Sequence, residues 1–285
     1  MSRPPRAVAV THVTAPDVFN RRQEEGRSSV GAVNDTTAPR PGSPGAPLWD
    51  PTAIPAATVV VVRDATPTSG APGGLEVLVL RRDRDLSFAG GTWVFPGGRI
   101  DPADHPAGGD DLEHAARSAA VREANEEAGL VIDRSVLRRW SHWTPPPETP
   151  KRFSTAFFVA AVPAGHDGVV IDDGEIREHA WRQPAEMLEL HAAGEVSLTP
   201  PTYITLTQLR GYPSSTEVVE AKRAVEHFAT RFAVVGDSVV AMYHGDPGYE
   251  SGDPGSVDLT TDSPLHRLVM GRQWTYVRRT PVPDV

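Results

Sequence analysis

The clearest hydrophobic pattern in the chain is a pair of short apolar runs rich in β-branched residues, at residues 56–62 and 75–80. Runs of this kind are typical of buried strands, and the Pro- and Gly-rich turn between them predicts a hairpin. Residues 151–161 alternate and then become wholly apolar, and residues 175–181 predict one more strand. Several strands with one long helix among them predict a mixed α/β sheet.

Helical periodicity occurs at four places along the chain. The predicted helices cover residues 111–128, 184–193, 201–211 and 216–228. The first carries small residues on one face, which allows close packing on a sheet, and Asp110 or Asp111 is a suitable N-cap. Residues 232–242 and 265–277 predict two further strands. No internal repeat is visible.

Composition divides the chain into three parts. Residues 1–49 are rich in Pro, Gly, Ser, Thr and Arg and contain few large apolar side chains. Such a segment cannot bury enough surface to offset the entropy of ordering, so we predict a disordered tail. The remaining chain divides at about residue 190 into a main domain, 50–190, and a C-terminal extension, 191–285, that carries helices and strands.

Charge and composition exclude several classes of function. The net charge of −9 argues against a general affinity for nucleic acid backbones. The absence of cysteine excludes disulfides, thiolate metal sites and a cysteine nucleophile. No apolar run reaches the roughly 18 residues of a membrane span, and the first residues make a poor secretory signal. We therefore expect a cytoplasmic protein with no membrane partner.

Three glutamates form the most informative cluster in the sequence. Glu123, Glu126 and Glu127 stand at i, i+3 and i+4, which places them on one helix face within about 5–6 Å of each other. Like charges this close repel unless a cation lies between them. Crowded carboxylate oxygens suit Mg²⁺ or Mn²⁺. Arg122, at i, i+4 to Glu126, can orient that carboxylate.

The segment Arg122-Glu123-Ala124-Asn125-Glu126-Glu127-Ala128-Gly129, preceded by Phe95-Pro96-Gly97-Gly98, resembles the signature of the Nudix hydrolase family. A solvated acidic helix face is the alternative. Five fixed positions would match by chance in about one of several thousand chains of this length, so we prefer the family resemblance. It covers roughly residues 55–190 and implies an α/β/α sandwich with a mixed sheet.

The loop half of this box departs from the family pattern. Counted back from Arg122, His114 stands where the family has a glutamate, and residues 100–111 resemble an insertion of about ten residues. Their Gly, Pro and Asp content predicts a loop. An interrupted box resembles the branch that includes the peroxisomal coenzyme A diphosphatases.

The resemblance implies a metal-dependent diphosphatase. Four groups would hold Mg²⁺ or Mn²⁺, namely Glu123, Glu126, Glu127 and the Gly98 carbonyl. Arg122 would orient a glutamate, and Glu126 or Glu175 would take a proton from the attacking water. Glu175 is equally well explained as an ordinary loop acid. Arg82 and Arg152 are candidates for substrate phosphates, although Arg82 also fits a solvated strand end.

The attached group of the substrate stays open among several alternatives. The branch implies a small nucleotide substrate, coenzyme A or acyl-coenzyme A, but Ser87 stands where those enzymes often have a second arginine. Three prolines at 145–147 fit relatives that cleave ADP-ribose or other nucleotide sugars. A non-catalytic sensor with a DNA-binding helix pair at 201–228 is the other class, which the eight basic and ten acidic residues of 201–285 disfavour. A homodimer is compatible with the sequence.

Overall fold

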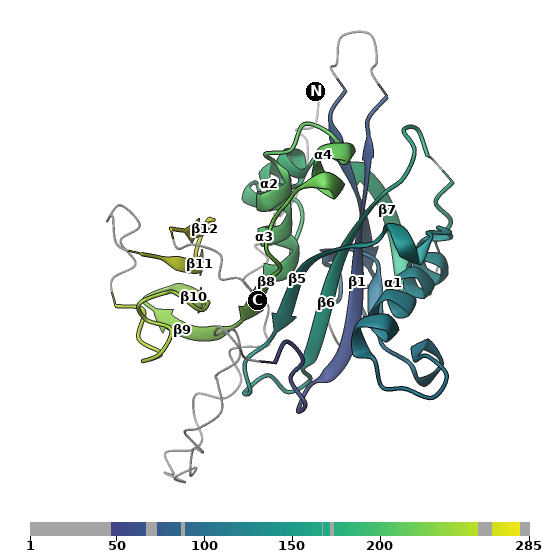
Figure 1. Ribbon diagram of the computed structural model, residues 1–285. Coiled ribbons are helices and arrows are strands. Elements are labelled where there is room, and N and C mark those ends of the chain that lie inside the picture. The colour runs from purple at the N-terminus through teal and green to yellow at the C-terminus, as the bar shows by residue number, and fades with distance from the viewer. Residues whose placement is uncertain are drawn as a thin grey trace, which may run out of the picture. The chain divides into compact units, whose positions relative to one another are not determined.

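The computed structural model describes residues 47–66, 73–86, 89–166, 168–171, 174–255 and 264–279, and Figure 1 shows them as coloured ribbons. The predicted N-terminal tail lies outside the described residues except for its last three positions. Ser87 also lies outside them. Within the described ranges, the pattern of apolar residues places most of the elements correctly.

The strands and helices follow one another along the whole described chain. The strands are β1 (Ile54–Asp64), β2 (Leu75–Arg82), β3 (Trp93–Val94), β4 (Gly97–Arg99), β5 (Arg138–Thr144), β6 (Phe153–Ala161), β7 (Ile176–Arg182), β8 (Glu226–Ala229), β9 (Arg231–Val235), β10 (Ser238–Met242), β11 (His266–Met270) and β12 (Trp274–Arg278). The helices are α1 (Leu112–Ala128), α2 (Pro184–Ala192), α3 (Pro200–Leu209) and α4 (Ser215–Glu220), with 3-10 turns η1 (Pro102–Asp104) and η2 (Arg134–Val136). None of the helices described is long and apolar enough to cross a membrane.

The larger sheet is mixed, as the sequence predicts. Six strands follow the order β3-β2-β1-β6-β5-β8, while β4 pairs with β1 and β7 pairs with β2. The pairs β1–β6 and β5–β8 are parallel, and the other pairs in this sheet are antiparallel. β4 pairs with the first residues of β1, where Gly98 lies opposite Ala57. This arrangement brings the glycines of the box next to α1.

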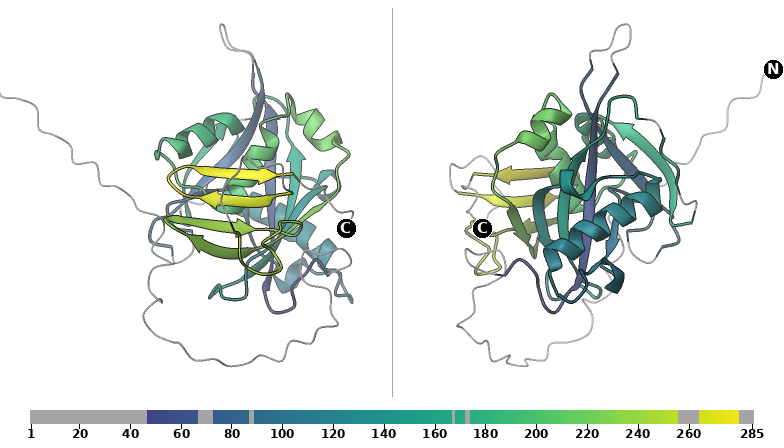
Figure 2. Two further views of the ribbon diagram at one scale, coloured as in Figure 1. Left: turned by 90° about the vertical axis from the view of Figure 1, so that its left-hand side faces the viewer. Right: turned by 45° about the vertical axis from the view of Figure 1, so that its right-hand side comes forward.

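Helices cover both faces of this sheet, which confirms the α/β/α sandwich. α1 lies on one face, and α2, α3 and α4 lie on the other (Figures 1 and 2). The α1 face toward the sheet is built from alanines, and Ala116, Ala120 and Ala124 are fully buried. Small side chains let the helix backbone approach the strands closely. The glutamates on its last turns are therefore held beside β4, which pairs with the central strand β1.

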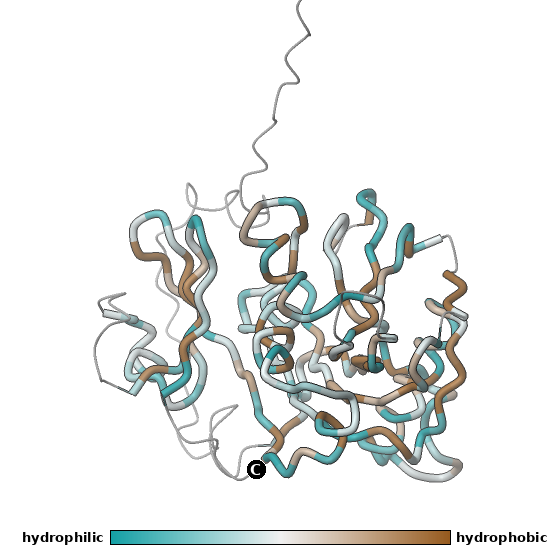
Figure 3. The backbone as a smooth tube through the Cα atoms, turned by 90° about the horizontal axis from the view of Figure 1, so that it is seen from above, coloured by the Kyte–Doolittle hydropathy of each residue, from teal (hydrophilic) through white to brown (hydrophobic). Residues whose placement is uncertain are grey.

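A second sheet, β12-β11-β10-β9, is antiparallel throughout. Ala241 and Leu268 of this sheet, and Tyr243 directly after β10, belong to the same buried cluster as Trp143 of the large sheet and Leu209 of α3. Figure 3, coloured by hydropathy, shows hydrophobic stretches within this part of the chain and largely hydrophilic turns between them. The C-terminal strands therefore share one hydrophobic core with the α/β/α layers.

Three predicted elements in the C-terminal part are wrong in extent. The helix predicted at 216–228 ends after six residues, and Glu226–Ala229 forms β8 instead. Stacking of Phe228 on Trp143, with ring centroids 4.0 Å apart, overrides the helical periodicity of this segment. The strands predicted at 232–242 and 265–277 are each hairpins, because turns at Gly236 and Gly271 divide them.

Candidate active site

Helix α1 places the three glutamates, and its two ends follow from the sequence. Asp111 is the N-cap, and its carboxylate accepts hydrogen bonds from the backbone N–H groups of Glu113 and His114. Gly129 ends the helix in the left-handed conformation with φ 66°, where a residue with a side chain is disfavoured. These ends set the limits of α1 and place its last two turns beside Gly97 and Gly98 of β4.

The three glutamates differ in how far they are exposed. The side chain of Glu126 is 56% exposed, that of Glu123 is 13% exposed and that of Glu127 is 9% exposed. Burial raises the pKa of Glu127 to about 8, although the Gly97 N–H donates a hydrogen bond of 2.9 Å to its carboxylate. Burial also raises the pKa of Glu123, against the opposing effect of Arg122. Burial therefore disfavours the charged form of both carboxylates unless a cation binds to them.

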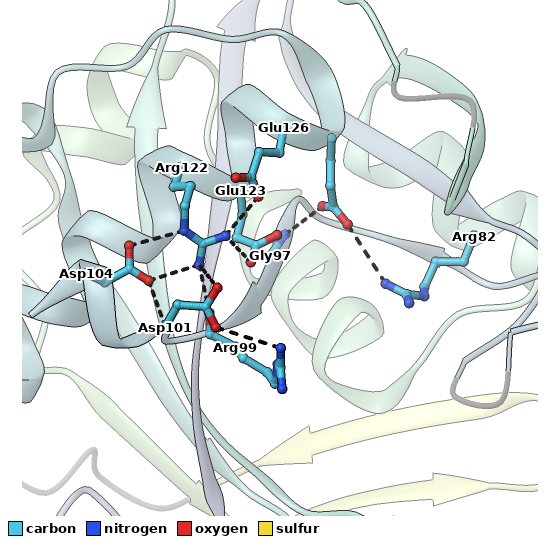
Figure 4. Close-up of polar contacts among 9 residues, drawn as sticks. Arg82, Gly97, Arg99, Asp101, Asp104, Arg122, Glu123 and Glu126 are labelled. Atoms are coloured by element: carbon cyan, nitrogen blue, oxygen red, sulfur yellow. Dashed lines mark hydrogen bonds and ion pairs between the residues drawn. The ribbon is translucent and has the colours of Figure 1, made fainter.

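Arg122 is the centre of the polar contacts (Figure 4). Its Nη1 donates to Glu123 and to Glu126, each at 2.8 Å. Its other nitrogens face Asp104, with Nε–Oδ1 at 3.2 Å and Nη2–Oδ2 at 2.9 Å, and Nη2 also donates to the Arg99 carbonyl at 2.9 Å. The hydrogen bonds with Asp104 are the main reason that the pKa of Arg122 is raised. The predicted contact between Arg122 and Glu126 is thus present.

The donors of this site suit a hard divalent cation, although they are not arranged as a finished cage. No three His, Asp or Glu side chains converge in the described ranges. The reason is that Arg122 draws Glu123 and Glu126 toward itself, while Glu127 turns to the Gly97 amide. Oxygen donors with pKa values raised by burial are nevertheless what Mg²⁺ or Mn²⁺ would stabilise. These residues therefore fit such an ion by chemistry.

Gly98 lies in close contact with the carboxylate of Glu123. A Cβ atom added at Gly98 would come within 2.6 Å of the Glu123 Cδ. A side chain at this position would push the carboxylate away, so the sequence at 98 and the position of Glu123 are coupled. Gly97 is equally confined, since an added Cβ would lie 2.6 Å from the Ala57 carbonyl oxygen. The two glycines allow the close approach of β4 and α1.

Substituting Gly98→Ala tests this coupling. We expect the affinity for Mn²⁺, measured by isothermal titration calorimetry on metal-stripped protein, to fall by roughly tenfold or more, as for other changes that misorient metal ligands. Gly211→Ala is a suitable control, because an added Cβ there meets no atom within 4 Å. Equal Mn²⁺ affinity of the Gly98→Ala and wild-type proteins would contradict a ligand role for Glu123.

Arg82 and Glu175 lie together beside the glutamates. Arg82 Nη2 is 3.1 Å from Glu175 Oε2, and its Nη1 is 3.9 Å from Glu127 Oε1. Glu175 precedes β7 and has a side chain that is 59% exposed. The pairing of β7 with β2 therefore brings a residue 93 positions away from Arg82 to the site. Both predicted residues are close to the acidic cluster.

Comparison with known proteins assigns the fold to a family. The profile of the NUDIX domain matches residues 53–200, just over half of the chain. The chain belongs to the Nudix family. In a solved Nudix hydrolase from Alicyclobacillus acidocaldarius, 96% of that chain matches 59% of this one with 26% identity and a TM-score of 0.52. This likeness confirms the predicted Nudix fold.

Two relatives of known name are similar over longer stretches. A protein of Caenorhabditis elegans named putative nudix hydrolase 7 is 30% identical over 170 residues, which are 47% of this chain and 55% of that protein. A chicken (Gallus gallus) protein named acyl-coenzyme A diphosphatase NUDT19 is 24% identical over 272 residues, 85% of this chain and 68% of that protein. The chain thus spans between about half and two thirds of the length of these relatives.

The contacts of Arg152 are with residues outside the glutamate cluster. Its guanidinium bonds to the Asp50 carboxylate, to the Thr52 hydroxyl at 2.7 Å and to the Pro145 carbonyl at 2.9 Å. Its side chain is 11% exposed. These contacts tie the start of β1 to the loop before β6, which is a structural role that sequence reasoning did not anticipate. The structure does not bring Arg152 to the acidic cluster.

The contacts of His114 and Asp104 differ from those that the Nudix box pattern predicts. His114 lies in the first turns of α1, and its ring Nε2 is 2.8 Å from Arg134. Asp104, which sequence reasoning missed, bonds to Arg122 and is 6% exposed. Asp104 is one of several acids in the insertion, and no spacing rule marks it among them. Only the fold of the insertion identifies the partner of Arg122.

Proposed function

We propose that this Nudix protein is a metal-dependent hydrolase that cleaves the diphosphate bond of a nucleoside diphosphate linked to another group. The observation that carries the proposal is the Arg122-centred cluster, in which one guanidinium orients Glu123 and Glu126 beside the buried Glu127. Mg²⁺ or Mn²⁺ bound to these carboxylates would supply charge neutralisation and an acidified water. A non-catalytic sensor need not retain these carboxylates, so their presence favours catalysis.

The protein's own side chains divide the remaining work. Arg122 Nη1 donates to one oxygen of Glu123 and one oxygen of Glu126, which holds both carboxylates on the same side of the guanidinium. Glu126 and Glu175 are the exposed carboxylates of the site, and either can accept a proton from the attacking water. Arg82 lies between Glu127 and Glu175, where a substrate phosphate would compete for its guanidinium.

A basic hollow next to Arg82 supports an anionic substrate. Arg81, Arg82, Asp83, Arg84 and Arg177 line this hollow. Three of the four guanidinium groups are paired with carboxylates, Arg81 with Glu178, Arg82 with Glu175 and Arg177 with Asp83. Substrate phosphates would compete with these carboxylates, because planar guanidinium groups match phosphate oxygens in pairs. We propose that phosphate groups of the substrate bind here, at the end of β2 that also carries Arg82.

Substituting Arg84→Ala tests the basic hollow. Arg84 is exposed and lies outside the acidic cluster, so we expect KM to rise by roughly threefold to tenfold while kcat changes little. Arg210→Ala, which removes an exposed arginine at the end of α3, is the matched control. Steady-state kinetics that show equal KM values for all three proteins would contradict substrate binding in the hollow.

For the attached group, we propose coenzyme A or acyl-coenzyme A. The support is the interrupted box and the similarity to the chicken protein named acyl-coenzyme A diphosphatase. A DNA-binding sensor has lost its main support, because α4 contains only six residues and the following segment forms a strand. ADP-ribose is the competing substrate, because the prolines at 145–147 resemble those of relatives that cleave it.

A product assay with Mg²⁺ and then Mn²⁺ tests this proposal. The substrates are coenzyme A, an acyl-coenzyme A, ADP-ribose and diadenosine polyphosphates. We expect adenosine 3′,5′-bisphosphate and a phosphopantetheine product from the coenzyme A compounds. Cleavage of ADP-ribose alone would retain the chemistry and overturn the proposed substrate. No cleavage of any of these compounds would count against the proposed enzyme.

A further inference from the structure

The insertion in the Nudix box returns a carboxylate to the active-site arginine. Residues Pro102–Asp104 form the short turn η1 within the insertion, and Asp104 is its last residue. The Asp104 carboxylate receives two bonds from Arg122, on Nε and Nη2, and one of 2.8 Å from the Asp101 backbone N–H. Its side chain is 5% exposed. A carboxylate buried to this extent requires a cationic partner, and Arg122 is that partner.

Position 114, where the count along the sequence places the box glutamate, lies too far from the Arg122 guanidinium to pair with it. α1 already begins at Leu112, so His114 and Arg122 are eight residues apart within one helix. Eight residues correspond to about 12 Å along the helix axis, and the Arg122 guanidinium extends toward Glu126 and away from position 114, so a glutamate there would not meet it. The His114 ring contacts Arg134 instead. Position 114 therefore lies away from the site, and the fold of the insertion supplies Asp104 as the acid that pairs with Arg122.

We propose that Asp104 is the positioning residue of this active site and replaces the glutamate expected at position 114. Asp104 and the Arg99 carbonyl occupy the Nε and Nη2 side of the guanidinium, which leaves only Nη1 toward Glu123 and Glu126. This orientation prevents Arg122 from forming a two-nitrogen pair with either glutamate. Their remaining oxygens stay free to bind a metal ion. The inference rests on the proposed function for the identity of that ion.

The test is the affinity of the 285-residue, metal-stripped protein for Mn²⁺ without substrate, measured by isothermal titration calorimetry. Asp104→Asn keeps the shape of the side chain and removes its charge, and we expect a 10- to 100-fold weaker Kd, as is typical for partners of metal ligands. Asp110→Asn, in an exposed position of the same insertion, should bind as tightly as the wild type.

A double substitution shows whether Asp104 acts through Arg122. In an Arg122→Gln background, Asp104→Asn should cause little further loss, because the contact that it removes is already absent. Adding His114→Glu to Asp104→Asn should restore nothing, since position 114 is too far from Arg122. Equal losses in both backgrounds, or recovery with His114→Glu, would overturn the proposal.

A spectroscopic readout covers the case in which Asp104→Asn lowers stability. In ¹⁵N-labelled wild-type protein, the Nε–H of Arg122, assigned with Arg122→Lys, should exchange slowly because it is held by Asp104. A rapidly exchanging Nε–H in the folded wild type would overturn the proposal. Unchanged Mn²⁺ affinity of Asp104→Asn would do the same. A wild-type protein that binds no Mn²⁺ would overturn both this inference and the metal dependence of the proposed function.

Discussion

Substituting Glu127→Gln is expected to reduce kcat by on the order of two to four decades while the protein keeps its fold. Glu127 is buried on the last turn of α1, and glutamine retains the size and the acceptor for the Gly97 N–H. The substitution removes only the negative charge that a divalent cation needs. Steady-state turnover with saturating Mn²⁺ measures the loss, and circular dichroism verifies the fold.

The same substitution has the opposite effect on stability without metal. The pKa of Glu127 is raised from 4.5 to about 8, so the folded state favours the protonated carboxyl. This contribution to stability is complete below about pH 4.5 and is lost as the pH rises toward 8 and above. In EDTA at about pH 8, Glu127→Gln should therefore melt at a higher temperature than the wild type. Mn²⁺ should raise the melting temperature of the wild type by more than that of Glu127→Gln.

Glu220→Gln is the matched control for both measurements. Glu220 is exposed at the end of α4, and its substitution should leave turnover and both melting curves unchanged. Near-normal turnover of Glu127→Gln, or an equal response to Mn²⁺ in both proteins, would contradict the assignment of Glu127 as a ligand.

The largest effect on stability is expected from Asp246→Ala in the C-terminal part of the chain. The Asp246 carboxylate pairs with Arg267, at 2.7 Å to Nε and 2.6 Å to Nη2, and it also accepts from the Gly248 and His266 backbone N–H groups. Both side chains are at most 2% exposed. Removing one partner of a buried pair costs about 3–5 kcal/mol, because the other charge stays buried without compensation.

Differential scanning fluorimetry should show this loss as a fall in melting temperature on the order of 10 °C. Asp237→Ala, at the exposed β9–β10 turn, should change little. Replacing both partners, with Asp246→Leu and Arg267→Met, should recover part of the loss because no unpaired charge remains. If Asp246→Ala melts like the wild type, the C-terminal sheet does not share in the cooperative core that it joins through Tyr243 and Leu268.

The acidic half of the candidate site was predictable because helical periodicity is local. The spacing of Glu123, Glu126 and Glu127 determines one face whatever surrounds the helix, and Arg122 reaches Glu126 across one turn. Gly129 ends the helix by its own backbone preference. For the same reason the alternating and apolar runs predicted β1, β2, β6 and β7 nearly within their observed bounds.

Segments whose structure depends on distant partners were predicted less well. The residues after Glu220 have helical spacing, yet a parallel neighbour in β5 and the ring of Trp143 make Glu226–Ala229 a strand. Arg152 was predicted as a candidate for a substrate phosphate, and the fold gives it a carboxylate partner, Asp50, 102 positions away. A charged side chain takes the partner that the fold brings near, and the sequence does not contain that proximity.

The fold family, the three-glutamate face and the coupling of Arg122 to that face follow from local sequence patterns. The surroundings of these residues depend on the tertiary fold, because strand pairing sets contacts across long separations. The tertiary fold placed Gly98 against Glu123 and joined Arg82 to Glu175. It also gave Arg122 its buried partner, Asp104, because the insertion folds back beside α1, which no local pattern in residues 100–111 specifies.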